Sequence, residues 1–220
     1  MKRTIILIIL ATLLSVACNS TEEASDSTAG ALAAEETDPV IDSLTRLCLA
    51  DTSTDPVEIL EKMMSTSYCP MHGPLHHSLV GMALMTAYHN AGGQVDLEKG
   101  LARLIEQTQK IPGAACGNWG ACGATLSAGT FMSIVTDNSP FATEAWHLSN
   151  LCTARALEQV ASNGGPRCCK RDSYLTILST VDFVKENLGI EMHKPQVRCT
   201  RSQSNEQCIG QKCPFSPTND

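Results

Sequence analysis

The stretch from Ile111 to Ala124 (IPGAACGNWGACGA) places two thiols, Cys116 and Cys122, in an uncharged segment rich in glycine. Glycine lets the backbone turn tightly, so this composition predicts a loop that holds both thiols in a defined geometry. Thiolates bind soft metals and attack disulfides. The spacing is wider than that of a zinc-ribbon Cys-x-x-Cys pair, so the two cysteines need partners from elsewhere in the chain.

Cys168 and Cys169 are adjacent and lie among three basic residues, in the segment GGPRCCKR from Gly164 to Arg171. They precede a helical pattern, and the positive end of a helix together with these cations should lower the pKa of the thiols. A disulfide between neighbouring cysteines closes a strained ring and is easily reduced, which would suit redox chemistry. The same segment could instead bind an anion, or one cysteine could form a disulfide with a distant partner.

A third group of donors begins at Cys69, in the sequence Cys-Pro-Met-His. The Cys-x-x-His spacing of Cys69 and His72 is compatible with zinc. Three more cysteines lie in the C-terminal tail, at Cys199, Cys208 and Cys213, but they fit no standard ferredoxin spacing.

Helices must position these groups, because no segment alternates as a strand would and aromatic residues make up only 4% of the chain. The apolar periodicity predicts helices over residues 40–49, 53–65, 74–91, 97–109, 124–135, 144–161 and 172–188. The tail from Gly189 is polar and lacks a strong period. The sequence therefore predicts one all-α domain, residues 39–220, of about six to seven helices with an irregular, cysteine-bearing tail.

The N-terminus has the features of an export signal. Lys2 and Arg3 precede an apolar run that ends at Cys18 and is too short to span a bilayer. Cys18 resembles the lipidated cysteine of a bacterial lipoprotein, although Ser15 stands where a large aliphatic residue is usual. Residues 19–38 are acidic and poor in apolar side chains, which predicts a disordered tether. We therefore expect a lipid-anchored protein of the cell envelope that faces the periplasm or the exterior.

Some function classes are disfavoured by composition. A net charge of -7 argues against a general nucleic-acid-binding surface. The chain shows no P-loop, dinucleotide fingerprint or Gly-x-Ser-x-Gly motif in a suitable context. The expected partners are the membrane and a redox or metal-delivery protein, and the sequence does not decide whether the protein is an enzyme.

Several motifs taken together resemble an uncharacterised cysteine-rich family, domain-of-unknown-function family DUF5714, over about residues 69–215. The residues that carry the likeness are Cys69-Pro-Met-His72-Gly73, His76-His77, residues 87–93 (AYHNAGG), Ile111-Pro112-Gly113, residues 116–123 (CGNWGACG), residues 164–171 and residues 205–215. Members often lack export signals, which implies that the motif cysteines serve ligation or redox work, because cytosolic thiols stay reduced. The helix start at Cys122 also resembles, more loosely, small helical redox-type proteins with a Gly-Cys-Ala signature. Cys48 and Cys152 fall outside the family pattern and could form a disulfide with each other.

The leading hypothesis is a zinc or iron–sulfur site, and it has two ligand sets. The first comprises Cys116, Cys122, Cys168 and Cys169, and the second comprises Cys69, His72, Cys208 and Cys213. The expected supporting or anion-binding residues are Arg167, Lys170, Arg171, His76, His77 and Trp119. One alternative is a thiol–disulfide redox protein that uses Cys168 and Cys169, and another is a disulfide-stapled binding lipoprotein without catalysis.

Overall fold

The computed structural model describes residues 38–218, and within that range the chain forms α-helices, one short 3-10 helix and no strand. The elements are α1 (Pro39–Ala50), α2 (Pro56–Met64), α3 (Leu75–Asn90), α4 (Leu97–Thr108), α5 (Ala115–Asn118), α6 (Gly123–Val135), α7 (Glu144–Ser162), α8 (Cys169–Leu188) and the 3-10 helix η1 (Gly210–Lys212). This confirms the all-α fold. The expected signal peptide, Cys18 and all but the last residue of the expected tether lie outside the described residues.

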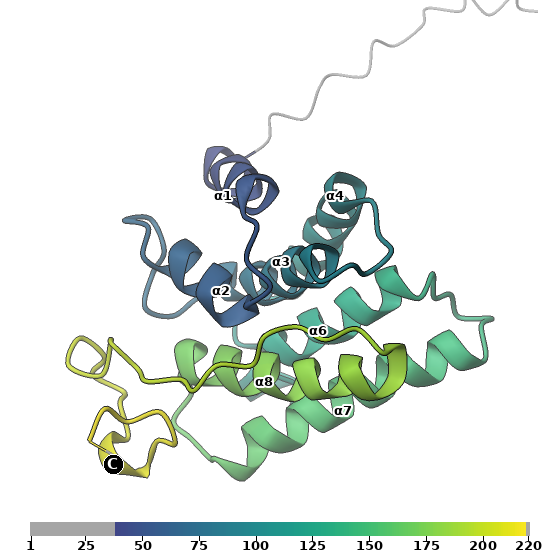
Figure 1. Ribbon diagram of the computed structural model, residues 1–220. Coiled ribbons are helices and arrows are strands. Elements are labelled where there is room, and N and C mark those ends of the chain that lie inside the picture. The colour runs from purple at the N-terminus through teal and green to yellow at the C-terminus, as the bar shows by residue number, and fades with distance from the viewer. Residues whose placement is uncertain (1–37, 219–220) are drawn as a thin grey trace, which may run out of the picture. The chain divides into compact units, whose positions relative to one another are not determined.

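Helix α3 is the centre of the domain. Nearly all of its side chains are buried, including Leu79, Met82 and Met85, which are fully inaccessible to solvent. It contacts α1, α2, α4, α6 and α8 (Figure 1). A helix that is apolar on every side is stable in water only when neighbours cover all of its faces, and these helices provide that cover.

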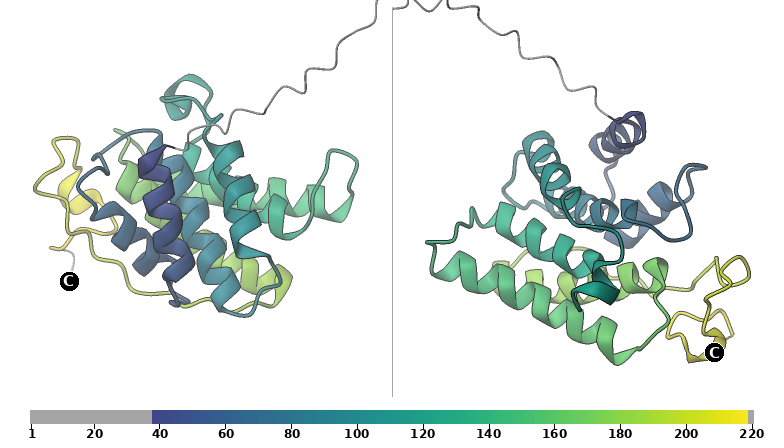
Figure 2. Two further views of the ribbon diagram at one scale, coloured as in Figure 1. Left: turned by 90° about the horizontal axis from the view of Figure 1, so that it is seen from above. Right: turned by 180° about the vertical axis from the view of Figure 1, so that it is seen from behind.

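Helices α6, α7 and α8 pack against one another and form the second half of the core (Figure 2). Gly129 lets α6 approach α7 closely, because a methyl group there would lie 1.9 Å from the Thr153 hydroxyl oxygen. Along the part of the chain that the structure describes, no helix has the length and apolar character needed to cross a membrane.

Aspartate side chains cap the starts of α1, α2 and α4. The carboxylate of Asp55 accepts hydrogen bonds from the amides of Val57 and Glu58, at 2.8 and 3.1 Å. Pro56 occupies the first turn, where its missing N–H costs nothing. Asp96 caps α4 in the same way, through the amide of Lys99.

The C-terminal tail returns along α8 to the end where that helix begins (Figure 1). The amide of His193 donates to the carbonyl of Thr54, at 2.9 Å, on the way. The amide of Cys199 donates to the carbonyl of Phe215, at 2.8 Å, and so closes residues 199–215 into a loop. This loop lies against the N-terminus of α8, where Cys168 is located.

Candidate functional site

Helix α8 begins three residues earlier than expected, at Cys169 rather than Asp172, because a cysteine caps it. The Cys168 sulfur accepts the amide of Arg171 at 3.5 Å, as a serine or aspartate oxygen does at other helix starts. The same sulfur accepts the side-chain amide of Asn205, from the tail, at 3.4 Å. Cys168 therefore faces the tail loop.

Each cysteine of the tail loop accepts a hydrogen bond from the backbone two residues ahead. The donors are Arg201 for Cys199 and Gly210 for Cys208, both at 3.4 Å, and Phe215 for Cys213. Gly210 has a φ of +59°, a conformation that favours glycine, and this turn directs its N–H at the Cys208 sulfur. Backbone N–H donors stabilise negative charge on sulfur, as they do around thiolates that bind metals.

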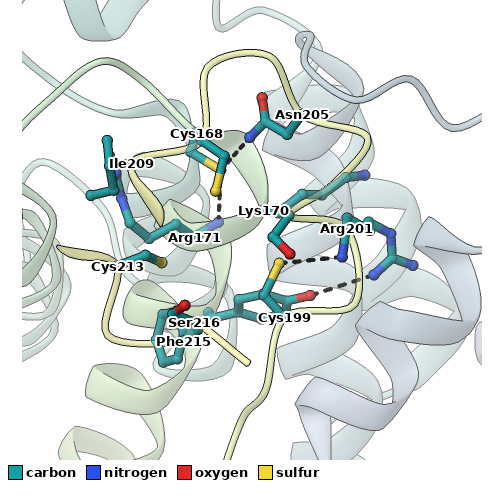
Figure 3. Close-up of a pocket in the computed structure, with 13 residues that line it drawn as sticks. Cys168, Lys170, Arg171, Cys199, Arg201, Asn205, Ile209, Cys213, Phe215 and Ser216 are labelled. Carbon is teal, nitrogen blue, oxygen red and sulfur yellow. Dashed lines mark hydrogen bonds between the residues drawn. The ribbon is translucent and has the colours of Figure 1, made fainter. Parts of the chain in front are cut away.

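These cysteines line one small cavity of about 20 Å³, and Figure 3 labels Cys168, Cys199 and Cys213 among the residues around it. Its cysteines are Cys168, Cys199, Cys208 and Cys213. The volume is enough for about one water-sized atom. Across residues 38–218, however, no three His, Cys, Asp or Glu side chains are placed closely enough to hold a metal ion as they stand.

Burial dominates the electrostatics of the cavity. It raises the pKa of Cys168 and of Cys213, although the amides of Arg171 and Phe215 oppose the shift. The expected lowering of the Cys168 and Cys169 pKa is therefore wrong, since burial raises the pKa of Cys169 as well. The pKa values rise because protein also covers the N-terminus of α8, and this burial outweighs the positive charge that the helix start supplies.

Cationic side chains also line the cavity, but each is held by its own partners. Arg171 donates to Asp172 and to the carbonyls of Gly164 and Pro166. Arg201 pairs with Glu61 at 2.5 Å, and so ties the tail loop to α2.

A buried tyrosine supports this tie between the tail and the helices. The hydroxyl of Tyr174 donates to the same carboxylate, that of Glu61. Its ring meets Phe215 of the tail edge to face, with centroids 5.3 Å apart. The tail loop is thus fastened to α2 and α8 by both polar and apolar contacts.

His72 was expected to be a ligand, but both of its ring nitrogens are engaged in hydrogen bonds. Nδ1 accepts the amide of Cys169 at 3.4 Å, which leaves Nε2 to donate to the Asn205 side-chain carbonyl at 3.0 Å. That bond orients the Asn205 amide toward Cys168. His72 therefore positions the donor to a cavity thiol.

The two expected loops do meet, but the four cysteines of the first expected ligand set do not gather around one point. Cys116 and Cys122 line a groove with Gly164 and Arg167, whereas Cys168 lines the tail cavity. Cys169 lines neither of the two. Burial raises the pKa of Cys122 to about 12.

Two supporting residues near this groove differ in their roles. Trp119, expected to support the site, is 67% exposed and does not shield it. His77 holds the Ile111–Ala124 stretch through the carbonyl of Ile111, at 3.3 Å from Nδ1.

Cys69, His76 and Lys170 form a separate cluster. Lys170 Nζ lies 2.9 Å from His76 Nε2 and 3.5 Å from the Cys69 sulfur. Cys69 therefore contacts a lysine, and it does not line the cavity that holds Cys208 and Cys213.

Among the described residues no cysteine forms a disulfide, and this includes Cys48 and Cys152. Cys48 lies 3.7 Å from the sulfur of Met63, in the α1–α2 region. Cys152 lies among α6, α7 and α8, 3.9 Å from the Thr180 hydroxyl. The structure therefore places these two thiols against different helices, and burial raises the pKa of each, to about 11 for Cys48 and about 12 for Cys152.

The sequence interpretation missed Cys199, Asn205 and Arg201 as parts of the site. A signal was present for Asn205, because it begins the segment 205–215 that carries part of the family resemblance. No local pattern could have paired Arg201 with Glu61, because 140 residues separate them.

Comparison with known proteins gives one match. A family model described as a family of unknown function (DUF5714) covers residues 44–216, which include all ten thiols of the described region. Neither the curated proteins nor the solved structures contain a match to this chain.

Proposed function

The chain belongs to the DUF5714 family, and we propose that it is an exported, lipid-anchored protein that binds zinc or an iron–sulfur cluster through four cysteine thiolates. The proposed ligands are Cys168, Cys199, Cys208 and Cys213. Four thiolates suit both kinds of centre, since Cys₄ sites hold structural zinc and also iron–sulfur clusters.

The observation that carries the proposal is the hydrogen bonding of the four sulfurs. Each of the four residues lines the same cavity, and each sulfur accepts a backbone N–H. A buried neutral thiol gains little from such donors, whereas a thiolate gains a charge-assisted hydrogen bond. The arrangement is therefore suited to sulfurs that carry negative charge.

A bound metal would supply the positive charge that the four sulfurs lack. Burial alone favours the protonated thiols, as the raised pKa of Cys168 and Cys213 indicates. Metal binding releases those protons and draws the ligands together. The tail loop can follow this contraction, because apart from η1 it has no regular structure of its own between residues 199 and 216.

Export and lipidation rest on the N-terminal sequence. Lys2 and Arg3, the apolar run after them and Cys18 make a lipoprotein signal, with an acidic segment behind it. Incorporation of labelled lipid that disappears in Cys18→Ala would support this part of the proposal. Equal incorporation in wild type and variant would reject it.

The metal proposal is tested on anaerobically purified full-length protein by elemental analysis and visible spectroscopy. We expect one zinc, or the iron, sulfide and visible absorption of one cluster, per chain. The double variant Cys199→Ser, Cys213→Ser should lose the metal, whereas Cys116→Ser, Cys122→Ser should retain it. Metal-free wild-type protein, or equal metal in all three proteins, would overturn the assignment.

A further inference from the structure

A second thiol site lies beyond the wall of the metal cavity, around the side chain of Lys170. The side chain runs away from Cys168 and Cys213, and the residue is only 2% exposed (Figure 3). Its ammonium has three acceptors: the carbonyl of Pro70 at 3.2 Å, His76 Nε2 at 2.9 Å and the Cys69 sulfur at 3.5 Å.

The protonation of His76 follows from its second ring nitrogen. Nδ1 lies 3.2 Å from the carbonyl of Gly73, which can only accept, so Nδ1 carries the hydrogen and Nε2 holds the lone pair. Nε2 therefore accepts from Lys170. Burial first, and then the Lys170 charge, lower the pKa of His76 to about 3, so the imidazole is neutral.

The charge of Lys170 needs an anionic partner, because a buried ammonium is costly unless it is paired. A carbonyl and a neutral imidazole cannot supply one. Among the three acceptors only the sulfur of Cys69 can carry negative charge.

We propose that Cys69 is a nucleophilic thiol that undergoes exchange with small-molecule disulfides, and that Lys170 is the counter-ion of its thiolate. The thiolate attacks one sulfur of the disulfide, whose S–S bond breaks as the Cys69 mixed disulfide forms. The departing thiolate takes a proton from water. Cys69 is half-buried and can be reached by such a molecule.

This activity does not depend on the metal centre, since Cys69 is not one of the four proposed ligands. Thiolate character and access together set the rate of exchange. Cys116 is more exposed than Cys69, and no cationic side chain of the described residues donates a hydrogen bond to its sulfur. Cys116 therefore serves as an internal reference: it is more accessible to the disulfide than Cys69 is, but it has no neighbouring ammonium group.

The test treats full-length protein with hydroxyethyl disulfide at one neutral pH and maps the modified cysteines by mass spectrometry over time. We expect Cys69 to react at least about tenfold faster than Cys116, because the thiolate is the reacting form. In Lys170→Met the advantage should disappear, while Lys110→Met, a surface substitution, should preserve it. Metal content is measured on the same samples, so failure here is separate from failure of the metal proposal.

Buried Cys152 reports on folding in the same experiment, since it stays unmodified in a folded chain. If Cys152 reacts in Lys170→Met, that variant is unfolded. The proposal is then judged by the rates of Cys69 and Cys116 in the wild-type protein. Wild-type Cys69 that reacts no faster than Cys116 would overturn the proposal. An undiminished advantage in folded Lys170→Met would also overturn it.

Discussion

Among single residues, Asn205 connects two parts of the site. Its amide donates to the Cys168 sulfur, and its carbonyl accepts from His72 Nε2 and from the amide of Gln207. The side chain has little rotational freedom, because both of its ends are bonded. It therefore holds a hydrogen-bond donor in a fixed position at a proposed metal ligand.

We predict that Asn205→Ala weakens metal binding by about 10–100-fold, the usual effect of removing a hydrogen bond to a ligand. Competition with a chelator measures this affinity. Gln207→Ala changes an exposed neighbour that does not line the cavity, and it should bind metal as wild type does. An affinity in Asn205→Ala that equals that of wild type would show that the donor is not needed.

The buried imidazole of His76 makes stability depend on pH. Its pKa falls from an ordinary 6.5 in the unfolded chain to about 3 in the folded protein, chiefly through burial. Below pH 6.5 the unfolded state therefore binds a proton that the folded state does not. The contribution of His76 to the free energy of unfolding is fully present above pH 6.5 and is lost progressively as the pH falls toward 3.

Between pH 7 and pH 5 this loss amounts to about 2 kcal/mol of unfolding free energy. Urea denaturation at the two pH values measures it. Carboxylates contribute to the same trend, so the comparison is with His76→Gln, whose amide stays neutral. The pH-dependent loss should be smaller by that amount in the variant, and an identical loss in both proteins would contradict the assignment.

Among the elements, the helices were the most predictable part of the fold. The buried face of α3 follows from its apolar composition, and the start of α2 follows from Asp55 and Pro56, which act within one turn of each other. The start of α8 was missed because a cysteine caps it, a role usually taken by serine or aspartate.

The site itself was less predictable than the helices. The meeting of the Ile111–Ala124 stretch with the segment before α8 was expected, and the two do share a groove. Cys168 lines the tail cavity and Cys169 does not, and this difference depends on the direction of α8 relative to the tail. That direction is set by distant contacts, such as the ring pair of Tyr174 and Phe215.

The crossing of α3 with α4 and α6 depends on one glycine. A methyl group on Gly81 would lie 2.6 Å from a terminal carbon of Leu104 and 2.7 Å from the Ser127 hydroxyl oxygen. Leu104 is fully buried, and the Ser127 hydroxyl accepts the amide of Gly81 at 2.9 Å. Neither side chain can move aside without losing a contact.

We predict that Gly81→Ala lowers the unfolding free energy by about 1 kcal/mol. Overpacking costs about 1–3 kcal/mol, and the better helix propensity of alanine returns about 1 kcal/mol. Urea denaturation measures the change. Gly117→Ala has no atom within 4 Å of the added methyl group and should be at least as stable as wild type. A Gly81→Ala protein that is more stable than wild type would contradict this crossing geometry.

At the scale of the whole molecule, the described residues 38–218 belong to one compact unit. All four proposed ligands lie within this unit, as does the Glu61–Arg201 pair that fastens the tail. The proposed roles of the N-terminal segment, export and anchoring, require no contact with the proposed metal centre. The two functions should therefore separate when the chain is cut between them.

We predict that a chain lacking residues 1–36 keeps the helical content and the metal of the full-length protein, and loses membrane attachment. Far-ultraviolet circular dichroism, metal analysis and membrane fractionation measure the three properties. Loss of helical structure in the shortened chain would show that the N-terminal segment takes part in the fold.

X-ray absorption at the edge of the bound metal tests the central claim most directly, because it counts and identifies the ligand atoms. We predict a first shell of sulfur alone: four sulfurs at about 2.3 Å for zinc, or sulfur with a second shell of iron for a cluster. The double variant Cys199→Ser, Cys213→Ser should lose this signal. A first shell that contains nitrogen or oxygen in the wild-type protein, or one unchanged in the variant, would contradict the four-cysteine assignment.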